Sequence, residues 1–82
     1  MDIALKDQFH SAVKLAQDGE WDASHRIVQD YNDAIACWIH AVLHKIEGDE
    51  INSRYWYARC NARFEDYANA SQELDAIEEF LI

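Results

Sequence analysis

The absence of proline constrains the fold of this chain most, and glycine is almost absent as well. The 82-residue sequence has no proline and only two glycines, Gly19 and Gly48. Because these two residue types most readily interrupt regular structure, the chain has few places to turn, which favours helices with short connections. β-Branched residues are sparse and form no alternating run. We therefore expect an all-α protein with a single helical domain over residues 1–82.

Apolar residues recur at helical spacing along most of the chain. Residues typical of helix termini mark the boundaries, with aspartate or asparagine at the starts and glycine at two of the ends. The first three predicted helices lie between Asp2 and Gly19, over roughly residues 20–30 and over roughly residues 34–47. The fourth begins after Asp49 and ends before a looser segment at 63–68, and the fifth begins after Asn69. The expected architecture is a compact bundle of about five helices.

The third helix is predicted to be the centre of the core, because Lys45 is its one unambiguous charge before Glu47. Its main apolar stripe consists of Ile35, Trp38, Ile39, Val42 and Ile46. A second, milder face consists of Ala36, Cys37, His40 and His44. A helix that is apolar on two faces is expected to contact neighbours on both sides.

The last two helices carry less regular patterns. For the fourth helix we expect a buried stripe of Ile51, Tyr55, Ala58 and Ala62. The consecutive aromatics Tyr55, Trp56 and Tyr57 point about 100° apart, so either Trp56 or Tyr57 is expected at the surface. For the last helix we expect Leu74, Ile77 and Leu81 to be buried. Its solvent face is predicted to carry Glu73, Asp75, Glu78 and Glu79.

The net charge of −9 disfavours binding partners that are themselves strongly negative. Phosphate backbones and anionic membranes repel such a surface, so we expect no nucleic-acid and no membrane binding. The acid excess is interpreted mainly as a device for solubility. The N-terminus does not resemble a signal peptide, and no apolar run approaches the roughly 20 residues of a membrane span, so we expect a cytoplasmic protein. Cys37 and Cys60 are expected to be reduced thiols that pack as small hydrophobes.

Three polar residues of the third helix share one face. Glu47 lies about 20° and His44 about 40° from His40 on the helical wheel. Two imidazoles one turn apart with a nearby carboxylate suit a divalent metal, and His25 could supply a fourth ligand. The pattern is not that of a zinc protease, because residue 41 is alanine. The alternative is a structural seam, in which the histidines bond to Glu47, Asn52 or a tyrosine and Trp56 covers them.

Two functions follow from these residues. The first is a small helical interaction module that binds a protein, a peptide, a ligand or a second copy of itself. Its candidate surface consists of Asn52, Tyr55, Trp56, Tyr57 and Arg59. The second is a metal-binding protein or a metal-dependent hydrolytic enzyme that uses His40, His44, Glu47 and His25. No complete catalytic set is present, so we assign no catalytic residue, expect no cofactor and keep a divalent metal as the alternative.

Two segments of the chain echo each other. In both segments, Gly19–His25 and Gly48–Arg54, a predicted helix ends at a glycine, acidic residues follow, and a new helix begins. This pattern resembles the antiparallel hairpins of tetratricopeptide and Sel1-type repeats, although the chain has room for only two.

A wider resemblance covers nearly half of the chain. The segments Trp21–Gln29, Trp38–Ala41, Leu43–Asp49 and Asn52–Tyr57 are similar to a small, mainly bacterial family of helical proteins with no assigned biochemical function. The resemblance implies a helical fold but no activity. It also implies signature positions at Trp21, His25, His40, His44, Glu47, Gly48, Asp49, Asn52, Tyr55, Trp56 and Tyr57.

Overall fold

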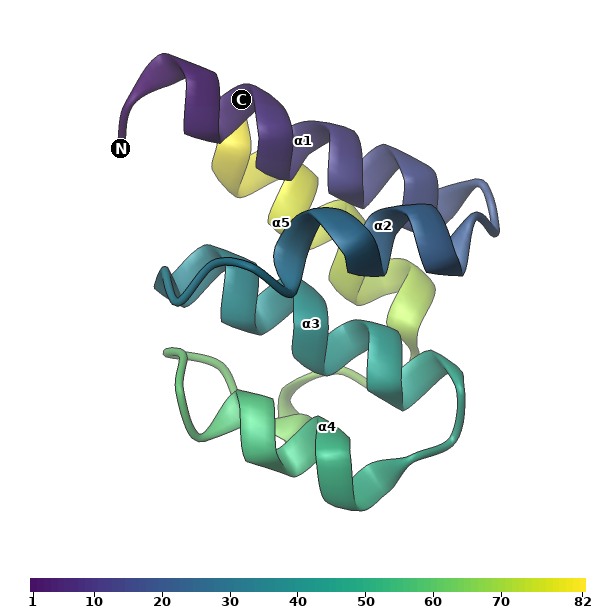
Figure 1. Cartoon of the computed structure of the whole chain (residues 1–82). Helices are drawn as coiled ribbons and strands as arrows, with labels where there is room; N and C mark the ends of the chain where they lie inside the picture. Colours follow the sequence, from purple (N-terminus) through teal and green to yellow (C-terminus); the bar gives the residue numbers. More distant parts are fainter.

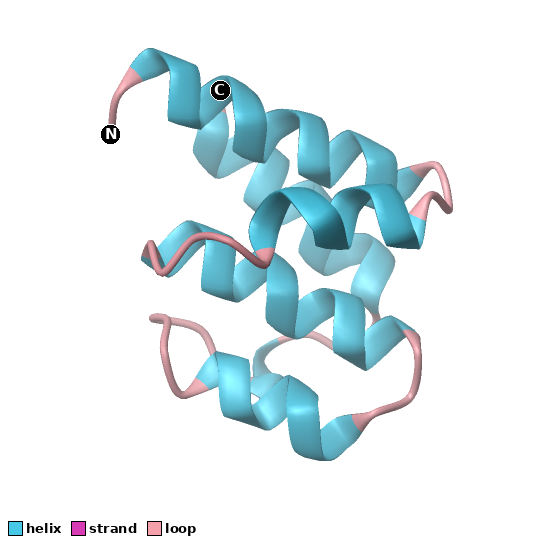
Figure 2. Ribbon diagram, in the orientation of Figure 1, coloured by secondary structure: helices cyan, strands magenta, loops and turns pink.

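The chain folds into five α-helices and one short 3₁₀ turn, and the computed structural model describes all residues 1–82 (Figure 1, Figure 2). The elements are α1 (Ile3–Gln17), α2 (Trp21–Val28), α3 (Ala34–Ile46), α4 (Glu50–Tyr57), the turn η1 (Phe64–Asp66) and α5 (Ala70–Leu81). This confirms the all-α bundle expected from the sequence. None of the five helices combines the length and the apolar character that a membrane crossing requires.

The helix α3 is the centre of the bundle, as predicted. The first four helices follow one another down the molecule in Figure 1, and α5 returns behind them. Helix α3 packs against α1, α2, α4 and α5, whereas α5 packs against α1 and α3. The third helix is therefore the one element that touches every other helix, which explains why its sequence is the most apolar of the five.

The two echoing segments close two similar helical hairpins, α1–α2 and α3–α4. Gly19 and Gly48 each end the first helix of a hairpin, with φ of 82° and 83°, a conformation that costs glycine little and other residues much. In each hairpin a buried serine five residues after the glycine crosses to the preceding helix. Ser24 Oγ donates to the carbonyl of Ala12, and Ser53 Oγ donates to the carbonyl of Ala41, both at 2.7 Å. The same bonds therefore hold both hairpins together.

The apolar core lies where α1, α3 and α5 meet. Its largest fully buried members include Phe9, Ile39, Leu43 and Ile77.

The caps expected at Asp2, Asp49 and Asn69 are all present, since each side chain accepts a hydrogen bond from the first turn of its helix. One residue of the predicted stripe departs from it: Ile46 is 45% exposed because it lies in the last turn of α3.

The buried face of α4 differs from the predicted stripe. Ile51 is 87% exposed and Tyr55 is 49% exposed, whereas Ser53 and Tyr57 are buried. The prediction was wrong because it followed apolar character alone. Ser53 is small enough to lie directly against α3, and the hydroxyls of Ser53 and Tyr57 both find acceptors there or on α5. The buried face of α4 is thus set by side chains that have hydrogen-bond partners on other helices, and not by the most apolar side chains.

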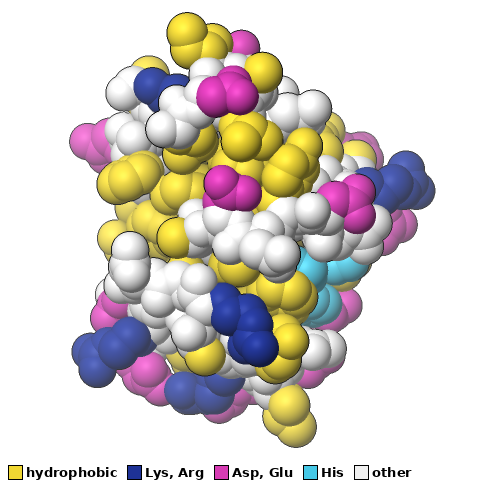
Figure 3. Space-filling model, turned by 60° about the vertical axis from the view of Figure 1, so that its left-hand side comes forward, with side chains coloured by type: hydrophobic (Ala, Val, Ile, Leu, Met, Phe, Trp, Pro, Cys, Tyr) yellow, Lys and Arg dark blue, Asp and Glu magenta, His cyan; other side chains and the backbone are white.

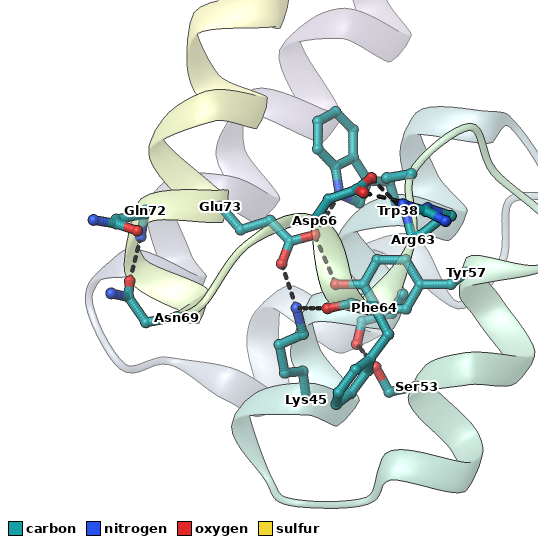
Figure 4. A network of polar contacts seen from close by, with 12 residues as sticks. Trp38, Lys45, Ser53, Tyr57, Arg63, Phe64, Asp66, Asn69, Gln72 and Glu73 are labelled. Atoms are coloured by element: carbon teal, nitrogen blue, oxygen red, sulfur yellow. Dashed lines mark hydrogen bonds and ion pairs between the residues drawn. The ribbon is translucent and has the colours of Figure 1, made fainter.

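Glu73 is fully buried, which corrects its predicted place on the solvent face of α5. Figure 4 shows its carboxylate facing side chains of α3 and α4. It accepts hydrogen bonds from Trp38 Nε1 at 2.7 Å, Lys45 Nζ at 2.8 Å and the Tyr57 hydroxyl at 2.6 Å. Burial and the adjacent carboxylate raise the pKa of Tyr57 well above its usual range. We call these four residues the Glu73 network; it joins α5 to α3 and α4.

Candidate metal centre

Three histidines from two helices meet at the joint between the hairpins. His40 and His44 lie one turn apart on α3, so both imidazoles leave the same face of that helix. His25 comes from α2, which packs directly against α3. Trp21 fixes this packing, because its indole Nε1 donates a 2.6 Å hydrogen bond to the carbonyl of Leu43. Figure 3 shows histidine atoms gathered at one edge of the surface of the molecule.

The three imidazoles are close enough to share one ion. One ring nitrogen from each of His25, His40 and His44 lies within 4.8 Å of the other two. The Nε2 atoms of His25 and His40 are 3.0 Å apart. Two imidazole nitrogens bound to one tetrahedral ion at about 2.0–2.1 Å lie about 3.3 Å from each other, so this pair is near the separation that zinc requires. We call these three residues the histidine cluster.

Two tryptophans form the walls of the histidine cluster. The ring of Trp56 stacks on His40 with centroids 4.0 Å apart, and the ring of Trp21 stacks on His25 at 4.8 Å. His40 and His44 are themselves stacked at 5.0 Å. The cluster is therefore enclosed by aromatic faces on two sides, which hold the imidazole planes and keep water away from His40.

Burial favours the uncharged form of two rings of the cluster, His40 and His25, near neutral pH. His40 is 4% exposed, and burial, helped by the neighbouring histidines, lowers its pKa to about 4. Burial and the charge of His44 also lower the pKa of His25, against weaker opposing effects of Glu47 and Asp22. Neutral imidazole is the form that binds a metal ion, so at pH 7 these two rings are ready to act as ligands.

One buried nitrogen of the cluster has no partner. His40 Nδ1 is enclosed and makes no hydrogen bond. By contrast, His44 Nδ1 faces the Glu47 carboxylate at 2.5 Å. Native structures leave few buried polar atoms without a partner, and each such atom calls for an explanation. The rings of the histidine cluster therefore have more hydrogen-bonding nitrogens than the surrounding protein has partners for.

The predicted site residues are brought together only in part. His25, His40 and His44 converge, and Trp56 covers His40 as the structural interpretation expected. Glu47 contacts His44 alone, and forms a separate group with His44 and Asp49. The role of Trp21 as the opposite wall was not predicted; its position one turn before His25 was the available signal, because such residues share a helix face.

The predicted interaction surface is smaller than expected. Tyr57 is 5% exposed and belongs to the Glu73 network, so it cannot take part in a surface. Tyr55 is exposed, and the Arg59 guanidinium stacks on its ring at 3.7 Å. Trp56 is half-buried against His40, and the Asn52 side chain bonds back to Asp49. Asn52, Tyr55 and Arg59 stay at the surface together with part of Trp56, but the Asn52 amide is already bonded to Asp49.

Comparison of the chain with protein-family models, with curated proteins and with solved structures finds no match. The resemblances to a bacterial helical family and to tetratricopeptide-type hairpins therefore stay predictions.

Proposed function

We propose that this protein binds one divalent transition-metal ion through imidazole nitrogens of His25, His40 and His44. The observation that carries the proposal is the convergence of His25 from one hairpin with His40 and His44 from the other, with ring nitrogens within 4.8 Å of one another. Three imidazoles without thiolates suit zinc, nickel, cobalt or copper, whereas magnesium and calcium prefer oxygen ligands. The net charge of −9 also attracts cations to the surface.

The main cost of binding falls on His40. If His40 binds the ion through Nε2, its hydrogen must lie on Nδ1, which has no acceptor. An unpartnered buried donor costs about 1–3 kcal/mol. Structural zinc in small zinc-finger peptides contributes roughly 10–16 kcal/mol, so this cost lowers the affinity without preventing binding. The same cost predicts a weaker site than one whose three histidines all have outer partners.

The proposal is for binding and not for hydrolysis. Three hollows lie on the surface, of about 480, 260 and 250 Å³, and none of them includes a histidine of the cluster. A hydrolytic metal site needs an open position next to a substrate pocket. The interaction role predicted from the sequence stays a prediction, and its candidate surface is reduced by the burial of Tyr57.

Thermal unfolding of the metal-free protein with added zinc tests the proposal. At free zinc one hundred times the Kd, the folded state gains about 2.7 kcal/mol. For a domain of this size, that gain raises the melting temperature by roughly 10 °C or more. Nickel and cobalt should act in the same way, and magnesium at the same concentration should have no effect.

The variant His25→Asn is the matched test, because His25 is only half-buried and its loss leaves the core intact. It should unfold near the temperature of the parent without metal and should lose the zinc response. The control is His10→Asn, since His10 is half-buried on α1 and contacts Glu78 away from the cluster. A zinc shift that survives in His25→Asn, or that is absent from the parent, would refute the proposed site.

A further inference from the structure

We infer that Glu47 acts as a positioning residue that holds His44 for the metal ion, and that it is not itself a ligand. The inference rests on the proposed metal-binding function and assigns to Glu47 a role other than the one expected from the sequence. It follows from the hydrogen bond between the two residues, from the composition of the two candidate ligand groups and from the place of Glu47 at the end of α3.

The bond between His44 and Glu47 fixes the tautomer of the ring. An ionised carboxylate can only accept a hydrogen bond, so the hydrogen of neutral His44 lies on Nδ1, which faces Glu47 Oε1. The lone pair of His44 is then on Nε2 and is free for an ion. Metal-binding histidines commonly donate their other ring hydrogen to a carboxylate in this way, which orients the ring and raises the basicity of the ligating nitrogen.

The geometry keeps Glu47 out of the group that would bind the ion. The ring nitrogens of His25, His40 and His44 form one group, and Glu47 belongs to another that it shares with His44 and Asp49. That second group is not available as an ion site of its own. Asp49 Oδ1 accepts from the backbone of Asn52, and Asp49 Oδ2 accepts from its side chain, so both oxygens already serve the cap of α4.

The end of α3 holds Glu47 in place. Glu47 is the C-terminal cap of α3, one turn after His44, and Gly48 turns the chain away in the left-handed conformation directly after it. The contact is therefore local and forms whenever the end of α3 is folded. Of the three clustered histidines, only His44 has a carboxylate bonded to it, which makes it the strongest of the three proposed ligands.

The affinity for zinc measures this role. Loss of an outer carboxylate weakens metal binding by about 10–100-fold. The Glu47 side chain is 40% exposed, so water weakens its contact with His44, and we expect the lower end, a loss of about tenfold, for Glu47→Ala. Glu47→Gln keeps an acceptor for His44 Nδ1 and should lose only about threefold.

The experiment measures zinc competition against a chromophoric chelator at pH 7 for the parent, Glu47→Ala and Glu47→Gln. Glu79→Gln serves as the control for charge, since Glu79 is exposed on α5 and is involved in no side-chain hydrogen bond or ion pair that the structure records. Absorption of the cobalt complex reports the ligand set. We expect the same visible bands in all four proteins, because the three ligating nitrogens do not change.

Each outcome decides between the two roles. Equal large losses in Glu47→Ala and Glu47→Gln, with altered cobalt bands, would show that Glu47 is a ligand. Affinities of both variants within about twofold of Glu79→Gln would show that it has no role in binding, since positioning requires at least tenfold. If the parent itself takes up no zinc or cobalt, the proposed function fails and this inference fails with it, whereas the two preceding outcomes leave metal binding intact.

Discussion

The histidine cluster and the Glu73 network are both groups of buried polar side chains centred on α3, yet they differ in how completely they are satisfied. In the Glu73 network, one carboxylate meets three donors, and Lys45 also donates to the carbonyl of Phe64. In the histidine cluster, His40 Nδ1 has no partner. A buried group that is fully paired has nothing left to bind. In the histidine cluster the Nε2 atoms of His25 and His40 meet only each other, and an ion between them would replace that contact. This difference separates a structural network from a candidate site.

The largest effect is expected from removing the centre of the Glu73 network. Glu73→Ala leaves the buried Lys45 charge without its carboxylate partner, and it leaves the hydrogens of Trp38 and Tyr57 without an acceptor. Breaking such a buried pair costs about 3–5 kcal/mol of unfolding free energy. Urea unfolding measures the loss, and Glu79→Ala on the exposed face of the same helix should change stability by less than about 0.5 kcal/mol. A similar small change in Glu73→Ala would mean that the network does not stabilise the fold.

A smaller effect is expected from acidification of the metal-free protein. The pKa of His40 is about 4 when folded and 6.5 in the reference state, so the unfolded chain binds more protons between these values. Stability is therefore fully present above pH 6.5 and falls as the pH drops toward 4, by about 3 kcal/mol at most from this residue. His25, whose pKa is also lowered, acts in the same direction.

Urea unfolding with a chelator present, repeated from pH 7.5 to pH 4.5, measures this dependence. The variant His40→Phe should flatten the curve, because it removes the most deeply buried imidazole. Parent and variant curves that fall in parallel would assign the acid sensitivity to groups other than His40.

The smallest effect on stability is expected from His40→Phe itself at pH 7.5. The phenyl ring can keep the stack on Trp56, and the exchange removes a nitrogen that had no partner. We expect a change within about 1 kcal/mol, together with complete loss of the zinc response. The matching apolar exchange in the Glu73 network, Glu73→Met, should be strongly destabilising, because the three groups that donate to Glu73 stay buried after their acceptor is removed. Equal costs in the two regions would remove the distinction between them.

The sequence predicted the helices well because their signals are local. The caps at Asp2, Asp49 and Asn69 and the left-handed glycines each depend on residues within one turn. The shared face of His40 and His44 is local for the same reason. The approach of His25 was predicted only as a candidate, because it depends on how α2 packs against α3.

The failures of prediction concern side chains whose partners lie far along the chain. Glu73 is buried because of Lys45 and Trp38, 28 and 35 residues away, and a pattern of charges on one helix cannot reveal such partners. Tyr57 was misplaced for the same reason, since its hydroxyl bonds to Glu73, 16 residues away. In a small core, a few long-range polar bonds decide which face of a short helix is buried.

The three tryptophans divide between the two regions, and this gives the protein its own optical probe. Trp21 and Trp56 stack on His25 and His40, whereas Trp38 donates to Glu73 on another side of α3. A paramagnetic ion such as copper(II) bound by the histidines would quench the emission of the first two indoles at contact distance. The third indole would keep its emission and serve as an internal reference, so occupancy of the site can be followed by intrinsic fluorescence without any added label.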